Sequence, residues 1–460
     1  MAKSQPSLPW LRGFLEGAGP RYLQIVAMIE EAVRAGGLRP GARLPPQRDL
    51  AGRLGVDLTT VTRAYTEARH RGLIDAMTGR GSFIAARPET SAFLLDLSMN
   101  IPPPPKGVRL ADKLQEGLAE VLRRSDVDLL MSYHIGAGSL ADRSAGCLWL
   151  EPLLGAVDPQ RLIVTLGAQP ALAALLGLLA GPGEAVAADR LTYPGLRAAA
   201  RQQGLRLQAV EGDAEGMLPE ALEVALAASG ARLLYLTPTI HNPTAVTLSA
   251  ARREAIVRIA RQRDIQIIED DPYARLAGDA PAPVAALAPE RTFYIATLSK
   301  TLTPGLRTAF VVAPSMPQSE ALVAALRGLI LMPSPLMTAL AVHWIRLGVA
   351  EELLDGVRRE ATDRQRAAAE ILPATGHAHP HGLHVWLPLP PHWDRHRLIE
   401  AARQEGLGVT PSDAFCIEGR APDAVRLSLG GIPDRARLVA ALRKLADILA
   451  DRHVSDAAVV

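Results

Sequence analysis

The 460-residue chain has few cysteines, few aromatic residues and no long apolar run. Its two cysteines, Cys147 and Cys416, are far apart and belong to no ligand motif, so we expect neither a disulfide framework nor a metal site. The longest apolar stretch, residues 171–181, is too short to cross a bilayer. No basic segment leads into an apolar core near the N-terminus, so no signal peptide is expected. These absences favour a cytoplasmic protein without a membrane partner.

Lysine is also scarce, because arginine supplies nearly all of the positive charge. Residues 1–90 hold 13 Lys and Arg against 8 Asp and Glu, a net charge of +5, which leaves −3 for the remainder of a chain whose total is +2. A basic N-terminal part on a slightly acidic body indicates a nucleic-acid contact at that end, although an ordinary solvated surface would give the same balance.

A proline-rich segment divides the chain. Residues 102–105 are four consecutive prolines, which favour extended geometry and cannot lie inside a helix. The length also favours more than one domain. We therefore predict an N-terminal domain over residues 1–86, a Pro-rich linker over 87–108 and a large domain over 109–460.

The N-terminal part has the pattern of a winged helix–turn–helix. Residues 21–36 show helical apolar spacing, residues 46–54 predict a short second helix that ends at Gly55, and a third helix follows Asp57. Residues 73–86 then alternate around a Gly-Arg-Gly turn, which predicts a hairpin.

In such a fold the third helix enters the major groove of DNA. Hydroxyls and backbone amides at helix starts contact phosphate, and arginine can bind guanine through two hydrogen bonds. The candidate DNA-contacting residues at the second helix, the third helix and the wing tip are Arg48, Thr59, Thr60, Thr62, Arg63 and Arg80.

Residues 37–85, "GLRPGARLPPQRDLAGRLGVDLTTVTRAYTEARHRGLIDAMTGRGSFIA", resemble the winged domains of GntR-family repressors. The resemblance implies binding to a double-stranded DNA operator. Leu58 stands where the family often has an arginine at the start of the recognition helix. A winged fold used only for protein contacts is the alternative.

The large part alternates apolar strands with helices, which indicates a parallel or mixed sheet covered on both faces. From about residue 350 a smaller α+β segment follows. At the end of one apolar run, in "TLSKTLTPGLR" (297–307), stands Lys300. A lysine that forms a Schiff base must lose its proton, which burial and neighbouring cations such as Arg307 promote. Taken alone, a single lysine at the end of a strand is most often a surface lysine.

Other residues complete a cradle for a pyridine ring with a phosphate. Asp270, at the end of a strand, can pair with a protonated ring nitrogen. Amides at a helix start suit a phosphate dianion, and hydroxyls and a bidentate cation can bind the same group. The full set of candidates is Ala168, Gln169, Tyr193, Asn242, Asp270, Tyr273, Thr297, Ser299, Lys300 and Arg307.

The order of the phosphate turn, Tyr193, "HNPT" (241–244), "DDPY" (270–273) and "SK" followed by Arg307 resembles the class I/II, fold-type I aminotransferases over about residues 109–448. The resemblance implies an α/β fold with a mixed sheet of the seven-stranded type and a small C-terminal α+β subdomain. It implies pyridoxal 5′-phosphate (PLP) as the cofactor and Lys300 as its Schiff-base lysine. Arg426 in "AVRLSLG" (424–430) then binds the carboxylate of an amino-acid ligand. Ala245 replaces the family's usual glycine.

The two parts together resemble MocR/GabR-type bacterial regulators, in which the aminotransferase-like body acts as a sensor. This resemblance implies a homodimer whose PLP, or an amino-acid or amine adduct of it, controls DNA binding. Two alternatives remain open. The chain could be an active aminotransferase that uses its N-terminal domain only for autoregulation or oligomerisation, or a GntR repressor whose body has lost cofactor binding.

Overall fold

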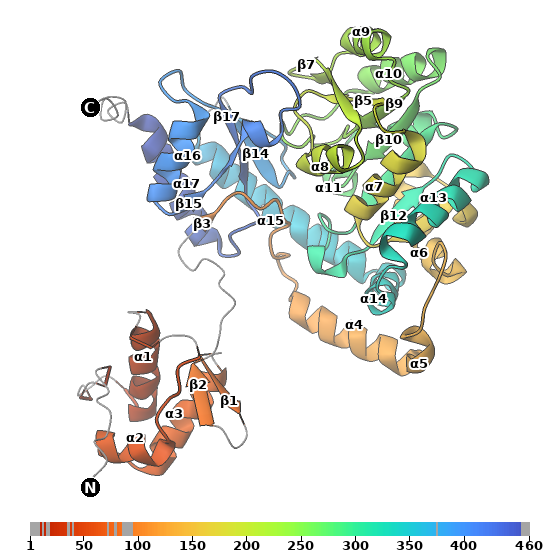
Figure 1. Ribbon diagram of the computed structural model, residues 1–460. Coiled ribbons are helices and arrows are strands. Elements are labelled where there is room, and N and C mark those ends of the chain that lie inside the picture. The colour runs from red at the N-terminus through yellow and green to blue at the C-terminus, as the bar shows by residue number, and fades with distance from the viewer. Residues whose placement is uncertain are drawn as a thin grey trace. The chain divides into compact units, whose positions relative to one another are not determined.

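The computed structural model describes residues 10–11, 13–14, 19–34, 37–38, 41–70, 73–77, 81–84, 95–373 and 376–451. The chain divides into two compact units, residues 1–93 and 94–460, each of which is considered by itself (Figure 1). Among the described helices of either unit, none combines the length and the apolar character needed to cross a membrane.

The first unit is a winged helix–turn–helix. Tyr65 and Val61, on the inner face of the third helix, are buried against Ile25 of the first. The Tyr65 hydroxyl donates a hydrogen bond of 2.8 Å to the Pro45 carbonyl, which satisfies this buried polar group. The predicted order of elements is confirmed: α1 (Arg21–Arg34), α2 (Gln47–Leu54), α3 (Leu58–His70) and an antiparallel hairpin of β1 (Ile74–Met77) and β2 (Gly81–Ile84).

The centre of the second unit is a mixed sheet. Within the described residues it has seven strands, and all run parallel except β12, which is antiparallel to both of its neighbours. In spatial order the strands are β4 (Leu162–Thr165), β12 (Ala309–Val312), β11 (Thr292–Thr297), β10 (Gln266–Asp270), β9 (Leu233–Leu236), β5 (Ala185–Asp189) and β6 (Arg206–Val210).

Both faces of this sheet are covered. Alternate residues of β11 point to opposite sides, so that Phe293 and Ile295 join one apolar cluster while Tyr294 and Ala296 join another. One face packs against α7 (Ala168–Leu179), α8 (Pro194–Gln202) and α13 (Met316–Ile330). The other packs against α6 (Leu140–Leu154), α9 (Pro219–Ser229), α10 (Ala250–Gln262), α14 (Pro335–Arg346) and α15 (Val349–Ile371).

A smaller α+β lobe follows α15, as predicted. Its antiparallel sheet has the order β13 (His377–Ala378), β14 (His384–Pro388), β17 (Ala424–Ser428) and β16 (Thr410–Pro411). Its apolar core lies against α16 (Arg395–Gln404) and α17 (Arg435–Ala450). Further elements of the second unit include α4 (Leu110–Arg124), α5 (Val127–Leu130), α11 (Ala274–Ala277), α12 (Val284–Leu287), β7 (Gly212–Asp213) and β8 (Gly216–Met217).

The described part of the segment predicted as a linker, residues 95–108, belongs to the second unit. Residues 85–94 lie outside the described residues, but β3 (Leu95–Asp96) pairs in parallel with β15 (Leu407–Gly408) of the small lobe. Pro102, Pro103 and Pro105 are buried. Pro105 lies so close to α15 that a Cβ at Gly356 would come within 2.8 Å of it. Residues 95–108 therefore pack on the second unit, through β3 against the small lobe and through Pro105 against α15.

The close approach of α6 to the sheet depends on Gly146, where a Cβ would lie 2.7 Å from Phe310 Cδ1 and 2.9 Å from Leu162 Cδ2. We expect Gly146→Ala to lower the free energy of unfolding by about 1–3 kcal/mol, because the core must shift to admit the methyl group. Urea denaturation measures the change.

Gly328 in α13 is the matched control, because no atom lies within 4 Å of a Cβ built there. Gly328→Ala should leave stability unchanged or raise it by up to about 1 kcal/mol through helix propensity. Equal effects of the two substitutions would contradict the packing argument.

Candidate functional site

The predicted site residues of the second unit converge at one edge of the large sheet. Asp270 ends β10 and Thr297 ends β11, while Asn242 follows β9, Tyr193 follows β5 and Ala168 follows β4. Parallel strands bring their carboxyl ends to the same edge, which is where open α/β sheets bind ligands. The structure therefore brings together residues as far apart in the sequence as Ala168 and Thr297, which are 129 positions apart.

Lys300 lies just beyond β11, among charged neighbours. Its Nζ donates a hydrogen bond to the backbone carbonyl of Asn100. Burial lowers the pKa of Lys300 to about 8, and the positive charges of Arg426 and Arg307 act in the same direction, whereas the carboxylate of Asp270 opposes them. The amine is therefore neutral in an appreciable fraction of molecules near neutral pH, as a nucleophilic lysine must be.

Asp270 supplies the negative end of the site. The Tyr235 hydroxyl donates a hydrogen bond of 2.8 Å to Asp270 Oδ2. Burial raises the pKa of Asp270 to about 6, while the Tyr235 hydrogen bond and the Lys300 charge lower it. At neutral pH the carboxylate is thus largely ionised and suited to a protonated ring nitrogen.

The opposite end of the site is built for an anion. Helix α7 begins at Ala168 after Gly167, and no described side chain caps its first N–H groups. A Cβ at Gly167, whose φ is 85°, would lie 2.8 Å from Nη2 of Arg307, so the guanidinium lies directly against the start of the helix. Thr297 Oγ1 and Ser299 Oγ, 3.0 Å apart, add hydroxyls from the end of β11. Free helix N–H groups beside arginine are typical of a phosphate site.

Gln169 serves to connect α7 with α8. Its Nε2 donates a hydrogen bond of 2.9 Å to the Gly195 carbonyl, and its Oε1 is buried without a described partner. A Cβ at Gly195 would lie 2.2 Å from both Gln169 Oε1 and Tyr193 Cε1. The Gln169 side chain thus contacts the turn that carries Tyr193, so only the backbone amide of Gln169 remains as the predicted phosphate donor.

Arg426, on β17, is buried beside Asn242. Its Nη1 donates to Asn242 Oδ1 at 2.9 Å and its Nη2 to the Ser98 carbonyl at 2.5 Å. The guanidinium lies 5.0 Å from the centre of the Phe415 ring. Among the described residues, Arg426 Nε has no hydrogen-bond partner although it is buried. A buried donor without a partner indicates a position that a ligand oxygen can fill.

Three functional neighbours were not predicted from the sequence: Tyr235, Asn100 and His384. Asn100 Nδ2 donates to the Tyr273 hydroxyl at 2.8 Å and lies 3.3 Å from His384 Nδ1. Burial, followed by the charge of Arg426, lowers the pKa of His384 to about 3, so its ring is neutral. Asn100 lay in the predicted linker, and the other two lie in apolar strands whose pattern carries no signal of a site.

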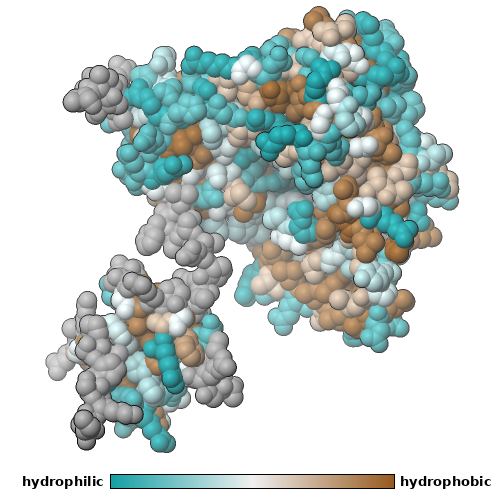
Figure 2. Space-filling view, viewed as in Figure 1, coloured by the Kyte–Doolittle hydropathy of each residue, from teal (hydrophilic) through white to brown (hydrophobic). Residues whose placement is uncertain are grey.

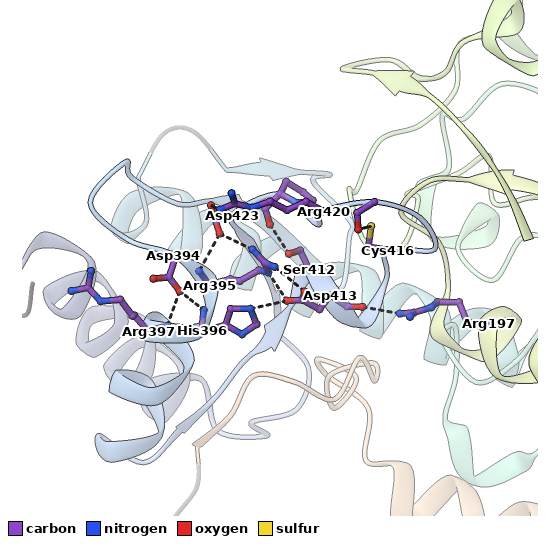
Figure 3. Close-up of polar contacts among 12 residues, drawn as sticks. Arg197, Asp394, Arg395, His396, Arg397, Ser412, Asp413, Cys416, Arg420 and Asp423 are labelled. Atoms are coloured by element: carbon purple, nitrogen blue, oxygen red, sulfur yellow. Dashed lines mark hydrogen bonds and ion pairs between the residues drawn. The ribbon is translucent and has the colours of Figure 1, made fainter. Parts of the chain in front are cut away.

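A polar network fixes the loop that carries Phe415 beneath Arg426. Figure 3 shows Arg395 between the carboxylates of Asp413 and Asp423, with 2.9 Å from Nη2 to Asp413 Oδ1 and 2.9 Å from Nη1 to Asp423 Oδ1. From α8, Arg197 Nη1 donates to the Asp413 carbonyl at 2.7 Å. The loop is therefore anchored in the small lobe and tied to the helix that follows Tyr193.

Ala245 has a left-handed backbone conformation, with φ of 60°, and its N–H donates to the His241 carbonyl at 2.6 Å. This conformation costs a non-glycine residue free energy, which explains why glycine is usual at the position after Thr244. The turn nonetheless forms with alanine.

The structure describes five of the six predicted DNA-contacting residues of the first unit. Arg48, on α2, and Thr59, at the start of α3, are exposed, and Thr60 is half-buried. The Thr62 hydroxyl donates a hydrogen bond of 2.8 Å to Gln47 Oε1. The guanidinium of Arg63 lies 4.1 Å from the centre of the Tyr22 ring, and Arg80 lies outside the described residues. Leu58, which stands where the family often has an arginine, is exposed at the start of α3.

Two protein families match the chain. The family described as aminotransferase class I and II matches residues 95–444. The family described as bacterial regulatory proteins, gntR family, matches residues 21–84. The chain belongs to the class I and II aminotransferase family, with a GntR domain before it. The predicted MocR-type architecture is confirmed.

Proteins similar to this chain are named as HTH-type transcriptional regulators or as aminotransferases. The chain is 28% identical to the HTH-type transcriptional regulator YdeF of Bacillus subtilis over 429 residues, which cover 92% of this chain and 93% of that one. It is 30% identical over 364 residues to the HTH-type pyridoxine biosynthesis transcriptional regulator PdxR of Corynebacterium glutamicum, which cover 75% of each. The structure of LysN, an α-aminoadipate aminotransferase from Thermus thermophilus, is similar with a TM-score of 0.71 and 27% identity, covering 84% of this chain and 98% of that one.

The cofactor of this aminotransferase family is PLP, and the residues of the site fit it. The uncapped start of α7 beside Arg307 suits the phosphate, and the ionised Asp270 suits the ring nitrogen. Between them lies Lys300, an amine that loses its proton readily. When bound, PLP supplies an aldehyde that reacts with amines and a ring that withdraws electrons.

The pKa of Lys300, about 8, predicts the pH dependence of PLP uptake by the full chain. The neutral amine is the reactive form, so the rate of uptake should rise as the pH passes through about 8 and then level off. A lysine with the ordinary pKa of 10.5 would continue to gain reactivity well above that pH. Absorbance of the bound cofactor, recorded at a series of pH values, measures the rate.

Lys444→Ala is the matched control, because Lys444 lies on the surface and its Nζ pairs with Glu405 Oε2 at 2.7 Å. This variant should reproduce the pH profile, whereas Lys300→Ala should abolish covalent uptake. A profile that keeps rising beyond pH 10 would contradict the lowered pKa.

Proposed function

We propose that this protein is a cytoplasmic transcriptional regulator that binds operator DNA through its first unit and senses PLP, or an amino-acid or amine adduct of PLP, through its second. The observation that carries the proposal is that one chain contains both a GntR domain and a site in which Lys300, Asp270 and Arg307 suit the groups of PLP. The relative named as a pyridoxine biosynthesis regulator supports a link to vitamin B6.

Within this proposal each residue of the cradle has a role. Lys300 is the lysine to which PLP is joined, and Asp270 pairs with the ring nitrogen. Tyr193 stacks on the ring, and Asn242 and Tyr273 bind its hydroxyl group. The phosphate is bound by the α7 amides of Ala168 and Gln169 together with Thr297, Ser299 and Arg307. Arg426, whose Nε has no hydrogen-bond partner in the part of the chain that the structure describes, binds the carboxylate of the effector.

On the DNA side, Arg48 is proposed to bind phosphate, and Thr59, Thr60 and Thr62 at the start of α3 contact phosphate or base edges. Arg63 takes part from its position on Tyr22, which orients the guanidinium. Arg80 is proposed for the wing tip from the sequence alone. An effector changes DNA binding only if it binds one arrangement of the protein more tightly than another.

The test measures binding of the full chain to a duplex from upstream of its own gene, with and without PLP and a panel of amino acids. The wild-type protein should bind the duplex and change its affinity when PLP is added. Lys300→Ala should still bind the duplex but lose the response to PLP, because the first unit is untouched while the covalent site is gone.

Lys444→Ala serves again as the control and should respond like the wild type. If Lys300→Ala retained the full response, the proposed sensor site would be wrong. Turnover assays with amino acids and 2-oxoacids address the alternative of an active aminotransferase. Multiple turnover without any effect of PLP on DNA binding would favour that alternative.

We further propose that the protein is a homodimer formed through the surface of α5 and the segment that follows it, residues 131–135. Figure 2 shows apolar side chains gathered over this part of the second unit. Leu129, Met131, Tyr133 and Ile135 are each more than half exposed, from 54% to 74%. Contiguous exposed apolar side chains of this kind are typical of a protein interface.

Met131→Glu should weaken the dimer, because it places a charge in the centre of the proposed interface. Light scattering after size exclusion should then give a mass near 49.0 kDa, whereas the wild type should give twice that value. Val224→Glu is the matched control, because Val224 on α9 is 70% exposed but lies outside this surface. A monomeric wild type would contradict the proposal.

A further inference from the structure

A cavity lies beside the candidate cofactor site. Its volume is about 310 Å³, at the lower end of the range of roughly 300–1,000 Å³ that small-molecule sites occupy. Its walls come from the ends of β5 and β6, from β7 and β8, from the residues after β9, and from the part of the small lobe that carries Arg420 and Pro422. None of the described residues that line it is a candidate for binding PLP, so this space is separate from the cofactor site.

Much of the cavity wall is apolar. Val210, Met217 and Leu248 line the cavity and are buried within the protein. Leu191 and Val246 also line it and are half-buried. Such a wall favours a ligand with a compact apolar body, because contact with the wall removes the apolar surface of the ligand from water.

Three carboxylates line the cavity, and two of them are already paired. Glu211 Oε1 lies 3.3 Å from Arg190 Nη1, and Asp213 Oδ2 lies 2.7 Å from Arg252 Nη2. The third, Asp189, has no arginine or lysine partner in the part of the chain that the structure describes, although only 15% of its side chain is exposed. A carboxylate in this position lacks the positive charge that usually accompanies a buried acid.

The neighbouring His241 does not supply that charge. Its Nε2 lies 3.6 Å from Asp189 Oδ2, and its Nδ1 lies 2.8 Å from Thr244 Oγ1. Burial lowers the pKa of His241 to about 4, so its ring is neutral near neutral pH. Burial also raises the pKa of Asp189 to about 7. A cation beside this carboxylate would therefore stabilise its ionised form.

The arginines that line the cavity are engaged elsewhere. Arg190 is paired with Glu211, and its Nη2 also donates to the Arg420 carbonyl at 3.0 Å. The Nη2 of Arg420 lies 3.4 Å from Asp423 Oδ2 in the small lobe (Figure 3). The cavity thus presents one acidic group that the surrounding protein leaves without a cationic partner among the described residues.

The missing cation is organic in character. Within the described residues, no group of three His, Cys, Asp or Glu side chains is arranged to hold a metal ion. An ammonium group needs only one carboxylate, to which its N–H donates, while the carbon atoms attached to it contact an apolar wall. The cavity offers both of these features.

We propose that this cavity binds a small organic cation, a compact apolar molecule with one ammonium group whose N–H donates to the Asp189 carboxylate. The site is separate from the cofactor cradle and does not depend on the proposed function. It lies next to the cradle, because His241 directly precedes Asn242 and Asp189 lies four residues before Tyr193. A ligand in the cavity therefore contacts the loops that carry two of the side chains proposed to bind PLP.

The test uses the full chain, loaded with PLP and then freed of excess cofactor. The cationic probe is N,N-dimethylbenzylamine, a tertiary amine that cannot condense with an aldehyde, and the uncharged comparison is benzyl methyl ether. Isothermal titration calorimetry measures both affinities. The amine should bind at least about tenfold more tightly than the ether, because only the amine forms a charged hydrogen bond to Asp189.

Asp189→Asn keeps the shape of the side chain and removes its charge. This variant should bind the amine about tenfold or more weakly, with no change for the ether. Glu215→Gln is the matched control, because Glu215 precedes β8, has a side chain that is 69% exposed and should alter neither affinity. Uptake of PLP, followed by absorbance, should be the same in both variants and shows that they are folded.

The affinity for the amine should also depend on pH. It should be about tenfold higher at pH 8 than at pH 6, because Asp189, with a pKa of about 7, must lose its proton before it pairs with a cation. His241, with a pKa of about 4, stays neutral over this range. The hydrogen bond from Arg252 lowers the pKa of Asp213, which stays ionised, and Glu211 faces Arg190. Asp189→Asn should abolish the pH dependence.

The outcomes are distinct from those that test the proposed function. Equal affinities for the amine and the ether, no binding of the amine at either pH, or full amine affinity in Asp189→Asn would each overturn this inference. Binding that requires the charge of the probe and of Asp189, and that strengthens between pH 6 and pH 8, supports it. None of these results involves operator DNA, so the proposed regulator is judged by its own experiment.

Discussion

The second unit is organised around the electrostatic environment of one amine, that of Lys300. Burial disfavours its charged form, and Arg426 and Arg307 repel a second positive charge nearby. Asp270 opposes them, which keeps the pKa from falling further. The result is an amine that loses its proton close to neutral pH. The site around it has a cation, Arg307, at one end and a carboxylate, Asp270, at the other. This arrangement suits an aldehyde that carries a phosphate and a ring nitrogen.

The sheet makes this arrangement possible because it brings distant strand ends to one edge. A glycine and a network of charged side chains then position individual side chains at this edge. Gly167 lets Arg307 lie against the start of α7, and the loop held by Arg395, Asp413 and Asp423 places Phe415 against Arg426. Gly167 thus affects the position of Arg307, and the three residues of the loop network affect the position of Phe415.

The beginning of the second unit contacts the same site. The carbonyl of Ser98 accepts a hydrogen bond from Arg426 Nη2, and the carbonyl of Asn100 accepts one from Lys300 Nζ. Two of the side chains predicted to bind ligands therefore also hold the backbone of residues 98–100.

The sequence by itself determined the two families, the order of elements in the winged unit, and the local groups around Lys300, Asp270 and Asn242, because these depend on short motifs and on hydrophobic periodicity. Only the tertiary structure decided that Asn100 meets His384, 284 positions away, that Tyr235 supports Asp270, and that residues 95–108 pack on the second unit. Such contacts bring together distant strands of the fold, and a run of prolines has the same local pattern whether it is solvated or buried. Local sequence specifies which groups a segment carries, whereas their partners are set by how the sheets and helices pack.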